Sequence, residues 1–266
     1  MRAFLPLLLW LMAAGAASAQ LSPKNAAGVT YGHVHLNVGD IEVHKTLWVE
    51  QFGGVLVSKG PLTAVKFPNM LIAFAQRAPS GPSQGTVMDH FGFRVRSMPD
   101  MLRAMRAAGF EVQREFTGAE GQPNAYVLGP DGLRFELQED PALQRVALPN
   151  HVHFYTPMYR ELLEWYTRTF SLAPRSRGTI ETTADAGSVN LTFAGADAPR
   201  APTRGRAIDH IGFEIQDLEA FCRQLELKGI TLDQAFREVP AIGLKIAYVM
   251  DPSGVYVELT EGYDRY

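Results

Sequence analysis

One stretch decides the fold because it occurs twice, as Gly32-His33-Val34-His35-Leu36-Asn37-Val38 and as Asn150-His151-Val152-His153-Phe154-Tyr155-Thr156, 118 positions apart. Residues 88–93 return as residues 208–213 at an offset of 120, and residues 129–136 return as residues 251–258 at an offset of 122. A nearly constant offset over three separate motifs indicates an internal duplication. The boundary falls near Pro149, so the predicted halves are residues 20–148 and residues 149–266.

Each half divides again, because each of the four histidine-bearing segments has the pattern of a strand followed by an amphipathic helix. The predicted helix starts are Asp40, Ser97, Thr156-Pro157 and Asp217, and the predicted stops are Gly53-Gly54, Gly109 and Gly229. Short strands separated by Gly, Pro and Asp turns follow each helix. Residues 76–85 and 194–206 are rich in Pro, Gly and Ala and are predicted linkers, so the chain holds four modules.

Strand periodicity places the histidines of these segments on one face of the sheet and the apolar residues on the other. Six of the seven histidines lie in the four segments, and Glu136 and Glu258 share their face; the histidines are His33, His35, His90, His151, His153 and His210. A curved sheet with helices outside makes that face concave. We therefore expect two histidines and one glutamate of each half to meet, as His33, His90 and Glu136 in the first half and as His151, His210 and Glu258 in the second.

Two imidazoles and one carboxylate are a ligand set for a divalent ion with open positions, such as Fe(II), zinc, manganese, nickel or cobalt. The alternative is that these histidines are ordinary polar residues on the wet face of a sheet. Their recurrence at equivalent places in both halves favours the metal site.

Residues 33–41 and 248–259 resemble the opening and closing segments of modules in the vicinal oxygen chelate superfamily. That superfamily includes glyoxalase I, extradiol ring-cleaving dioxygenases, fosfomycin-resistance enzymes and bleomycin-binding proteins. The resemblance implies an α+β fold of four βαβββ modules, paired into two glyoxalase-like halves whose curved sheets cup a metal. It also implies that His33 and His151 are ligands, and that His35 and His153 lie behind the ligands or contact substrate.

The sequence departs from both well-known activities of that superfamily. Glyoxalase I carries a second metal-binding Glu where Ala73 and Asn190 stand here, so Asn190 is predicted to be a weak fourth ligand and the second half to hold the better site. Extradiol dioxygenases share the triad and carry a Tyr ten residues before the Glu, as Tyr248 and Tyr126 stand here. They also use further histidines in later strands, which this chain lacks.

The resemblance and its departures together favour a divalent-metal-dependent lyase or isomerase that acts on a small oxygen-chelating substrate. Glu258, His153 and Tyr248 are the predicted catalytic residues. The alternatives are an Fe(II) ring-cleaving dioxygenase and a bleomycin-resistance-type binding protein without catalysis. Retained metal triads disfavour the binding protein, because sequestration needs no metal.

The N-terminus predicts export, because Arg2 precedes an apolar run over residues 4–17 and the small-residue cleavage pattern Ala17-Ser18-Ala19. Residues 1–19 are thus a predicted signal peptide, and the mature chain is expected in the periplasm or outside the cell. The alternative is an uncleaved anchor, but fourteen apolar residues fall short of the roughly twenty that cross a bilayer.

Composition limits the partners. A chain that is 46% hydrophobic and 20% charged forms a core, and a net charge of −3 with one cysteine excludes a basic nucleic-acid surface, an internal disulfide and a thiolate zinc site. We expect a small-molecule substrate, no nucleic acid and no membrane after signal removal. Whether modules pair within one chain or swap in a homodimer stays open from the sequence.

Overall fold

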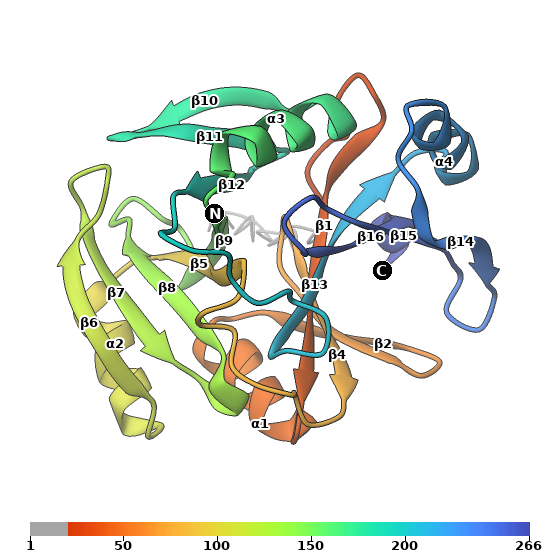
Figure 1. Ribbon diagram of the computed structural model, residues 1–266. Coiled ribbons are helices and arrows are strands. Elements are labelled where there is room, and N and C mark those ends of the chain that lie inside the picture. Colours follow the sequence, from red (N-terminus) through yellow and green to blue (C-terminus); the bar gives the residue numbers. More distant parts are fainter. Residues whose placement is uncertain (1–20) are drawn as a thin grey trace, which may run out of the picture.

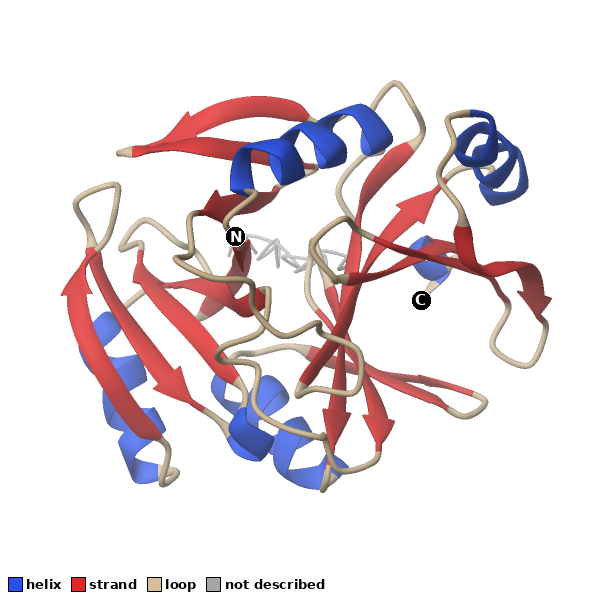
Figure 2. Cartoon of the chain, in the orientation of Figure 1, coloured by secondary structure: helices blue, strands red, loops and turns tan. Residues whose placement is uncertain are grey.

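Residues 21–266, which a computed structural model describes, consist of four modules, each with one strand, one helical segment and three further strands (Figures 1 and 2). The first two modules comprise β1 (Val29–Val38), α1 (Ile41–Lys45), β2 (Val55–Lys59), β3 (Leu62–Lys66) and β4 (Leu71–Gln76), then β5 (Met88–Val95), α2 (Met98–Ala107), β6 (Glu111–Thr117), β7 (Pro123–Leu128) and β8 (Arg134–Glu139). The other two comprise β9 (Ala147–Tyr155), α3 (Tyr159–Phe170), β10 (Ala173–Arg177), β11 (Ile180–Ala186) and β12 (Val189–Ala194), then β13 (Ile208–Ile215), α4 (Leu218–Leu227), β14 (Leu232–Val239), β15 (Leu244–Met250) and β16 (Tyr256–Glu261). The α+β fold of four βαβββ modules is confirmed.

Three of the predicted helix starts are also confirmed. The carboxylate of Asp40 accepts from the Glu42 N–H, the hydroxyl of Ser97 from Asp100, and the carboxylate of Asp217 from Ala220. The third helix begins later than predicted, at Tyr159, because the Thr156 hydroxyl accepts from the Met158 N–H in a turn before it. The first helix continues beyond α1 as a wider π-helical segment, Thr46–Gln51.

The modules form two eight-stranded sheets with the orders β14-β15-β16-β13-β1-β4-β3-β2 and β10-β11-β12-β9-β5-β8-β7-β6. In Figure 1 the two sheets lie side by side, and the linkers 76–85 and 194–206 cross between them. The first module shares a sheet with the fourth, and the second with the third. Each sheet therefore takes one module from either half, and both sheets are complete within one chain.

The helical faces still join modules that are neighbours in sequence. Trp48 follows α1 of the first module and stacks on Phe93 of β5 at 5.6 Å between ring centres. Phe170 of α3 stacks on Phe213 of β13 at 4.0 Å. Both contacts belong to one buried apolar cluster, in which Val34 and Leu36 represent the apolar face of β1. Consecutive modules thus share their core, while the sheets connect the two halves.

No helix within residues 21–266 is long and apolar enough to cross a bilayer. The predicted signal peptide and its cleavage site lie outside the described residues.

Candidate metal centres

The histidines and glutamates converge in two buried groups, each with its ligand atoms within 4.8 Å of one another. The β1–β13 site holds His33, His35, His210 and Glu258, and the β5–β9 site holds His90, Glu136, His151 and His153. The expectation that each half gathers its own triad is therefore wrong. Each site combines an opening strand of one half with an opening strand of the other, because β1 pairs antiparallel with β13 and β5 with β9.

A glycine lies at the centre of each site. Gly212 of β13 is paired with His33 of β1 on one side and with Glu258 of β16 on the other. Gly92 has the same place between His151 and Glu136. A Cβ on Gly212 would lie 1.9 Å from Cε1 of His33, and one on Gly92 would lie 2.2 Å from Cε1 of His151. The missing side chain lets the imidazole and the carboxylate meet above the sheet.

In the β1–β13 site one carboxylate oxygen is shared by two imidazoles. Oε2 of Glu258 lies 2.9 Å from Nε2 of His33 and 3.1 Å from Nε2 of His210. The Tyr248 hydroxyl donates to the other oxygen, Oε1, at 2.7 Å. All three ligand side chains are buried. The arrangement brings Oε2 and both imidazole nitrogens within 4.8 Å of one another.

An aspartate orients the third ligand in each site. Oδ1 of Asp209 lies 2.7 Å from Nδ1 of His210, and Oδ1 of Asp89 lies 3.0 Å from Nδ1 of His90. A carboxylate at Nδ1 keeps the proton there and leaves Nε2 free to bind a metal. These aspartates were not predicted as site residues, although the repeated Asp-His pair was the signal that could have found them.

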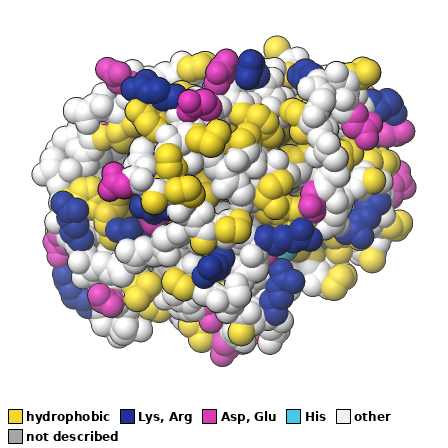
Figure 3. Space-filling model, in the orientation of Figure 1, with side chains coloured by type: hydrophobic (Ala, Val, Ile, Leu, Met, Phe, Trp, Pro, Cys, Tyr) yellow, Lys and Arg dark blue, Asp and Glu magenta, His cyan; other side chains and the backbone are white. Residues whose placement is uncertain are grey.

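Arginines hold these aspartates in place. Arg77, at the start of the first linker, donates to Asp209 at 3.1 Å, and Arg200 of the second linker donates to Asp89 at 2.9 Å. Arg134 adds a second contact to Asp89 at 2.8 Å. Figure 3 shows basic side chains on the face toward the viewer and almost no histidine, in agreement with the burial of the two sites.

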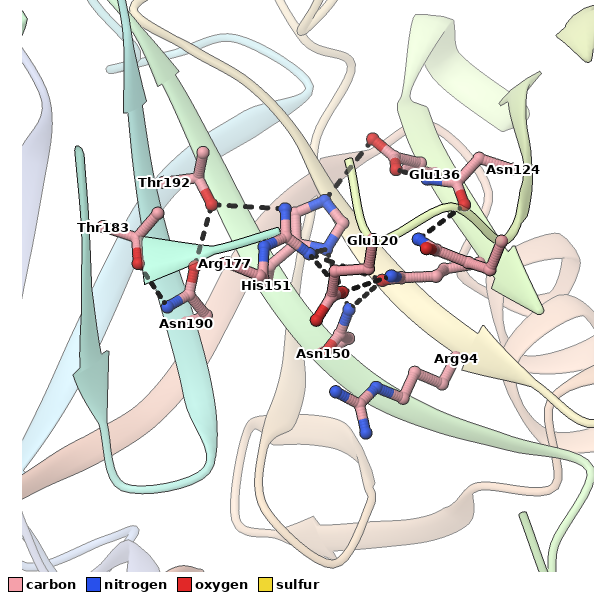
Figure 4. Close-up of polar contacts among 12 residues, drawn as sticks. Arg94, Glu120, Asn124, Glu136, Asn150, His151, Arg177, Thr183, Asn190 and Thr192 are labelled. Atoms are coloured by element: carbon pink, nitrogen blue, oxygen red, sulfur yellow. Dashed lines mark hydrogen bonds and ion pairs between the residues drawn. The ribbon is translucent and has the colours of Figure 1, made fainter. Parts of the chain in front are cut away.

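The β5–β9 site has the same ligand types in different surroundings (Figure 4). Oε2 of Glu136 lies 3.0 Å from Nε2 of His90 and 3.5 Å from Nε2 of His151, while Asn124 donates to Oε1. The guanidinium of Arg177 lies beside Nδ1 of His151, whereas Nδ1 of His33 has no hydrogen-bond partner among the described residues. The two sites are therefore alike in their ligands and unlike in what supports them.

The predicted catalytic residues do not all lie together. Glu258 and Tyr248 share the β1–β13 site, but His153 belongs to the β5–β9 site, where its ring stacks on Tyr155 at 4.5 Å and borders a pocket of about 360 Å³. In the β1–β13 site His35 occupies the corresponding position, with its ring 4.5 Å from that of His210.

Asn190 does not join His210 and Glu258, so that prediction is wrong. It pairs in register with His151, and its amide donates to Asp185 at 2.8 Å and accepts from Thr192 at 2.9 Å. Its structural counterpart in the first module is Leu71, because Leu71 pairs with His33 as Asn190 pairs with His151. The expectation of a better site in the second half fails with it, since neither half forms a site alone.

Burial and neighbouring groups shift the pKa values of the ionisable side chains in the β1–β13 site. Burial alone would lower the pKa of His210, but its hydrogen bonds to Asp209 and Glu258 outweigh burial and raise the pKa to about 9. Burial, aided by the charge of His210, lowers the pKa of His35 to about 3. Burial and the adjacent Glu258 raise the pKa of Tyr248, which therefore keeps its proton. At neutral pH the site offers a neutral imidazole and a phenol donor beside the ligand set.

The raised pKa of His210 predicts a pH-dependent stability of the metal-free chain. A folded-state pKa of about 9 against an ordinary 6.5 means stabilisation that is complete below pH 6.5 and is lost as the pH rises through 9. At 1.36 kcal/mol per pKa unit the contribution reaches up to about 3 kcal/mol. Urea unfolding of the parent and a His210→Gln variant should therefore show a difference that shrinks between pH 6 and pH 9.5.

His44 provides the control, because it is buried outside both sites and burial lowers its pKa despite its contact with Asp131. The effect of His44→Gln should not shrink over the same range. A difference for His210→Gln that stays constant with pH would contradict the assignment of His210 as the charged member of the site.

The donor set of the β1–β13 site fits a divalent ion. Two imidazole nitrogens and a carboxylate oxygen meet within hydrogen-bonding distance, and an aspartate already fixes the tautomer of one imidazole. Nδ1 of His33 has no hydrogen-bond partner among the described residues, so this nitrogen can hold the proton while Nε2 binds a metal.

Comparison with known proteins places the chain in a superfamily. The family model described as Glyoxalase/Bleomycin resistance protein/Dioxygenase superfamily matches residues 30–137 and 148–259. The chain belongs to this superfamily, as the resemblance of its opening and closing segments predicted. Two relatives, a putative lactoylglutathione lyase of Brassica oleracea var. gemmifera and a lactoylglutathione lyase of Arabidopsis thaliana, are each 29% identical over 119 residues. These matches span 40% of this chain and 42% of each relative's length.

Solved structures share the fold. Glyoxalase I from Zea mays superposes with a TM-score of 0.71 at 17% identity, covering 89% of this chain and 94% of the maize chain. A putative dioxygenase from Bacillus subtilis superposes with a TM-score of 0.66 at 12% identity, covering 92% and 87%. Both likenesses concern the fold alone.

Proposed function

We propose that the protein is a divalent-metal-dependent lyase or isomerase whose reaction takes place at the β1–β13 site, on a small substrate that chelates through two oxygens. The observation that carries this proposal is the shared oxygen of Glu258, which His33 and His210 approach within 3.1 Å in a buried setting. The names of the two plant relatives support a lyase, and a thiohemiacetal is one substrate class consistent with those names.

His33, His210 and Glu258 would hold the ion, and this donor set suits iron, zinc, manganese, nickel or cobalt. When bound, it supplies a Lewis acid that stabilises negative charge on a substrate oxygen. Tyr248 holds Oε1 of Glu258 and so keeps Oε2 turned toward the imidazoles. His35, whose ring lies 4.5 Å from that of His210 and is neutral at pH 7, is the proposed acceptor of a proton from substrate. Its counterpart in the β5–β9 site is His153, one of the three residues that the sequence predicted to be catalytic.

The same ligand set suits two other functions. The triad of this chain is compatible with ring cleavage by Fe(II) and oxygen, and the chain shares its fold with a putative dioxygenase from Bacillus subtilis. Sequestration of a ligand without catalysis would leave the oriented histidine and carboxylate groups without a role. The lyase or isomerase gives a role to both the ligand set and His35.

A substrate panel separates these functions. We expect metal-dependent turnover among α-hydroxycarbonyl, thiohemiacetal or epoxide compounds, and negligible oxygen uptake with simple catechols and Fe(II). A general acid or base contributes about a hundredfold to ten-thousandfold, and the sequence lacks the later-strand histidines that dioxygenases of the superfamily use. Oxygen-electrode and spectrophotometric assays of the metal-loaded chain provide the measurement.

Brisk oxygen consumption that disappears in a Glu258→Ala variant would establish the dioxygenase instead. Tight binding of panel compounds without turnover would favour the binding protein. A His35→Gln variant should lower turnover while retaining metal, which distinguishes a proton-transfer role from metal binding.

We also propose that the protein is exported, with residues 1–19 removed and Gln20 as the first residue. The pattern Ala17-Ser18-Ala19 supports this proposal. Expression of the full chain in a bacterial host should yield a periplasmic product whose intact mass is that of a chain beginning at Gln20. A periplasmic product that still carries Arg2 would favour the alternative of an uncleaved membrane anchor.

A further inference from the structure

The β5–β9 site differs from the β1–β13 site by a buried cation. Arg177 ends β10, its side chain is only 5% exposed, and its NH1 group lies 3.4 Å from Nδ1 of His151 (Figure 4). The nearest carboxylate oxygen to that guanidinium, Oε2 of Glu120, is 4.0 Å away. Arg177 therefore brings positive charge next to a predicted metal ligand.

A hydrogen-bond chain fixes which groups face His151. Oε2 of Glu120 can only accept, so Gln138 donates to it through Nε2 at 2.7 Å and turns Oε1 inward. That oxygen accepts from Nδ2 of Asn150, and Nδ2 also lies 3.3 Å from Nδ1 of His151. Asn150 and Arg177 thus both present N–H groups to Nδ1 of His151.

Two donors at Nδ1 oppose the form of histidine that binds a metal. A neutral imidazole that binds through Nε2 must carry its proton on Nδ1, where it would then face N–H groups only. An arginine cannot turn around to accept, because the guanidinium has no acceptor atom. His151 is therefore held with its proton on Nε2, and Oε2 of Glu136 lies 3.5 Å from that nitrogen.

Nothing of this kind opposes His33. The position before it is Gly32 instead of an asparagine, and Nδ1 has no hydrogen-bond partner among the described residues. Lys59 ends β2 as Arg177 ends β10, but Lys59 is exposed and lies over the ring of Tyr266. The ring of Tyr263 packs against His33 at 4.8 Å.

At other equivalent positions, too, the surroundings of the β5–β9 site are more polar than those of the β1–β13 site. The pairing registers equate four apolar residues around the β1–β13 site with four polar residues around the β5–β9 site, namely Ala64 with Thr183, Leu71 with Asn190, Ala73 with Thr192, and Ile246 with Asn124. The four apolar residues belong to one buried cluster, whereas the polar ones are tied into hydrogen bonds. At these four positions, therefore, the β5–β9 site is lined by hydrogen-bonded polar side chains and the β1–β13 site by apolar ones.

We propose that the chain holds one tightly bound divalent ion, at the β1–β13 site, and that Arg177 keeps the β5–β9 site from binding a second ion with comparable affinity. The inference rests on the proposed metal dependence. It assigns to Arg177 a role that the ligand residues alone do not reveal, since both sites contain the same ligand types.

Titration of the metal-free chain that begins at Gln20 with Zn²⁺ tests the proposal. We expect one tight equivalent and a second at least about tenfold weaker, because groups behind a metal ligand alter affinity by about 10- to 100-fold. His33→Ala should remove the tight equivalent and His151→Ala should retain it. Arg177→Met, which removes the charge and the donors but keeps much of the bulk, should strengthen the second equivalent by about 10- to 100-fold. Lys59→Met is the matched control and should change neither.

Two equal equivalents in the parent would overturn the proposal, as would a tight equivalent that survives His33→Ala and is lost in His151→Ala. A folded Arg177→Met variant with an unchanged second equivalent would also overturn it. The absence of any tight equivalent would instead contradict the proposed metal dependence, so the two failures are distinguishable.

A second measurement needs neither metal nor a folded Arg177 variant. Nitrogen-15 NMR of the metal-free parent should show His151 protonated at Nε2 and unprotonated at Nδ1, with its signals assigned by their loss in His151→Gln. Protonation of His151 at Nδ1 would refute the proposed action of Arg177.

Discussion

Replacing Glu258 with glutamine is expected to abolish tight Zn²⁺ binding and to lower turnover about a thousandfold or more. The carboxylate oxygen that both His33 and His210 approach would become half of a neutral amide. A bound ion supplies several kcal/mol of charge stabilisation, and each 1.36 kcal/mol is a factor of ten in rate. Calorimetric Zn²⁺ titration and initial rates in the substrate panel provide the two readouts.

Glu136→Gln is the matched control, because it makes the same change at the equivalent position of the β5–β9 site. It should keep the tight Zn²⁺ equivalent. Its turnover should stay within about threefold of the parent's, a smaller change than the loss of one hydrogen bond to a charged group would cause. Full activity in Glu258→Gln, or equal losses in both variants, would show that the reaction does not depend on the β1–β13 site.

A Gly212→Ala substitution is expected to disable the β1–β13 site without altering any ligand. Its Cβ would lie 1.9 Å from Cε1 of His33, a distance that forces the ring away from Glu258. We expect Zn²⁺ affinity to fall by more than about tenfold, as for other changes that misplace a ligand, and the chain to be destabilised by about 1–3 kcal/mol through overpacking. Zn²⁺ titration and urea unfolding measure the two effects.

Gly92→Ala separates the local effect from the general cost of overpacking. The added Cβ would lie 2.2 Å from Cε1 of His151, so a similar destabilisation should accompany an unchanged tight Zn²⁺ equivalent. If Gly212→Ala bound Zn²⁺ like the parent, His33 could not be a ligand in the position that β1 gives it.

The two sites also show that the same candidate ligands can stand in different surroundings. His210 and His90 each have an aspartate at Nδ1, so these ligands are equally well oriented. The difference lies one layer behind His33 and His151, where an aromatic ring stands in one site and a guanidinium in the other. A duplicated fold can thus retain two triads and support them differently.

Much of the architecture followed from local patterns. The alternation of Val34 and Leu36 with His33 and His35 placed the histidines on one face, and Asp217 and Gly229 marked the ends of α4 where the structure has them. Such features depend on a few neighbouring residues, whose backbone preferences and periodicity are readable along the chain. The α+β modules and the identity of the candidate ligands were therefore determined by the sequence alone.

Only the tertiary structure decided which ligands meet. The four modules carry the same pattern, so the edge of β1 can pair equally well with β5 or with β13 as far as apolar periodicity is concerned. The choice depends on how the helical faces pack. The contact of Trp48 with Phe93 joins the first two modules on their helical faces, and β1 pairs with β13. Arg177 shows the same dependence, because its effect on His151 exists only after β10 and β9 are folded into one sheet. Periodicity records which face a side chain occupies, whereas contacts between residues far apart in sequence arise from the packing of whole modules.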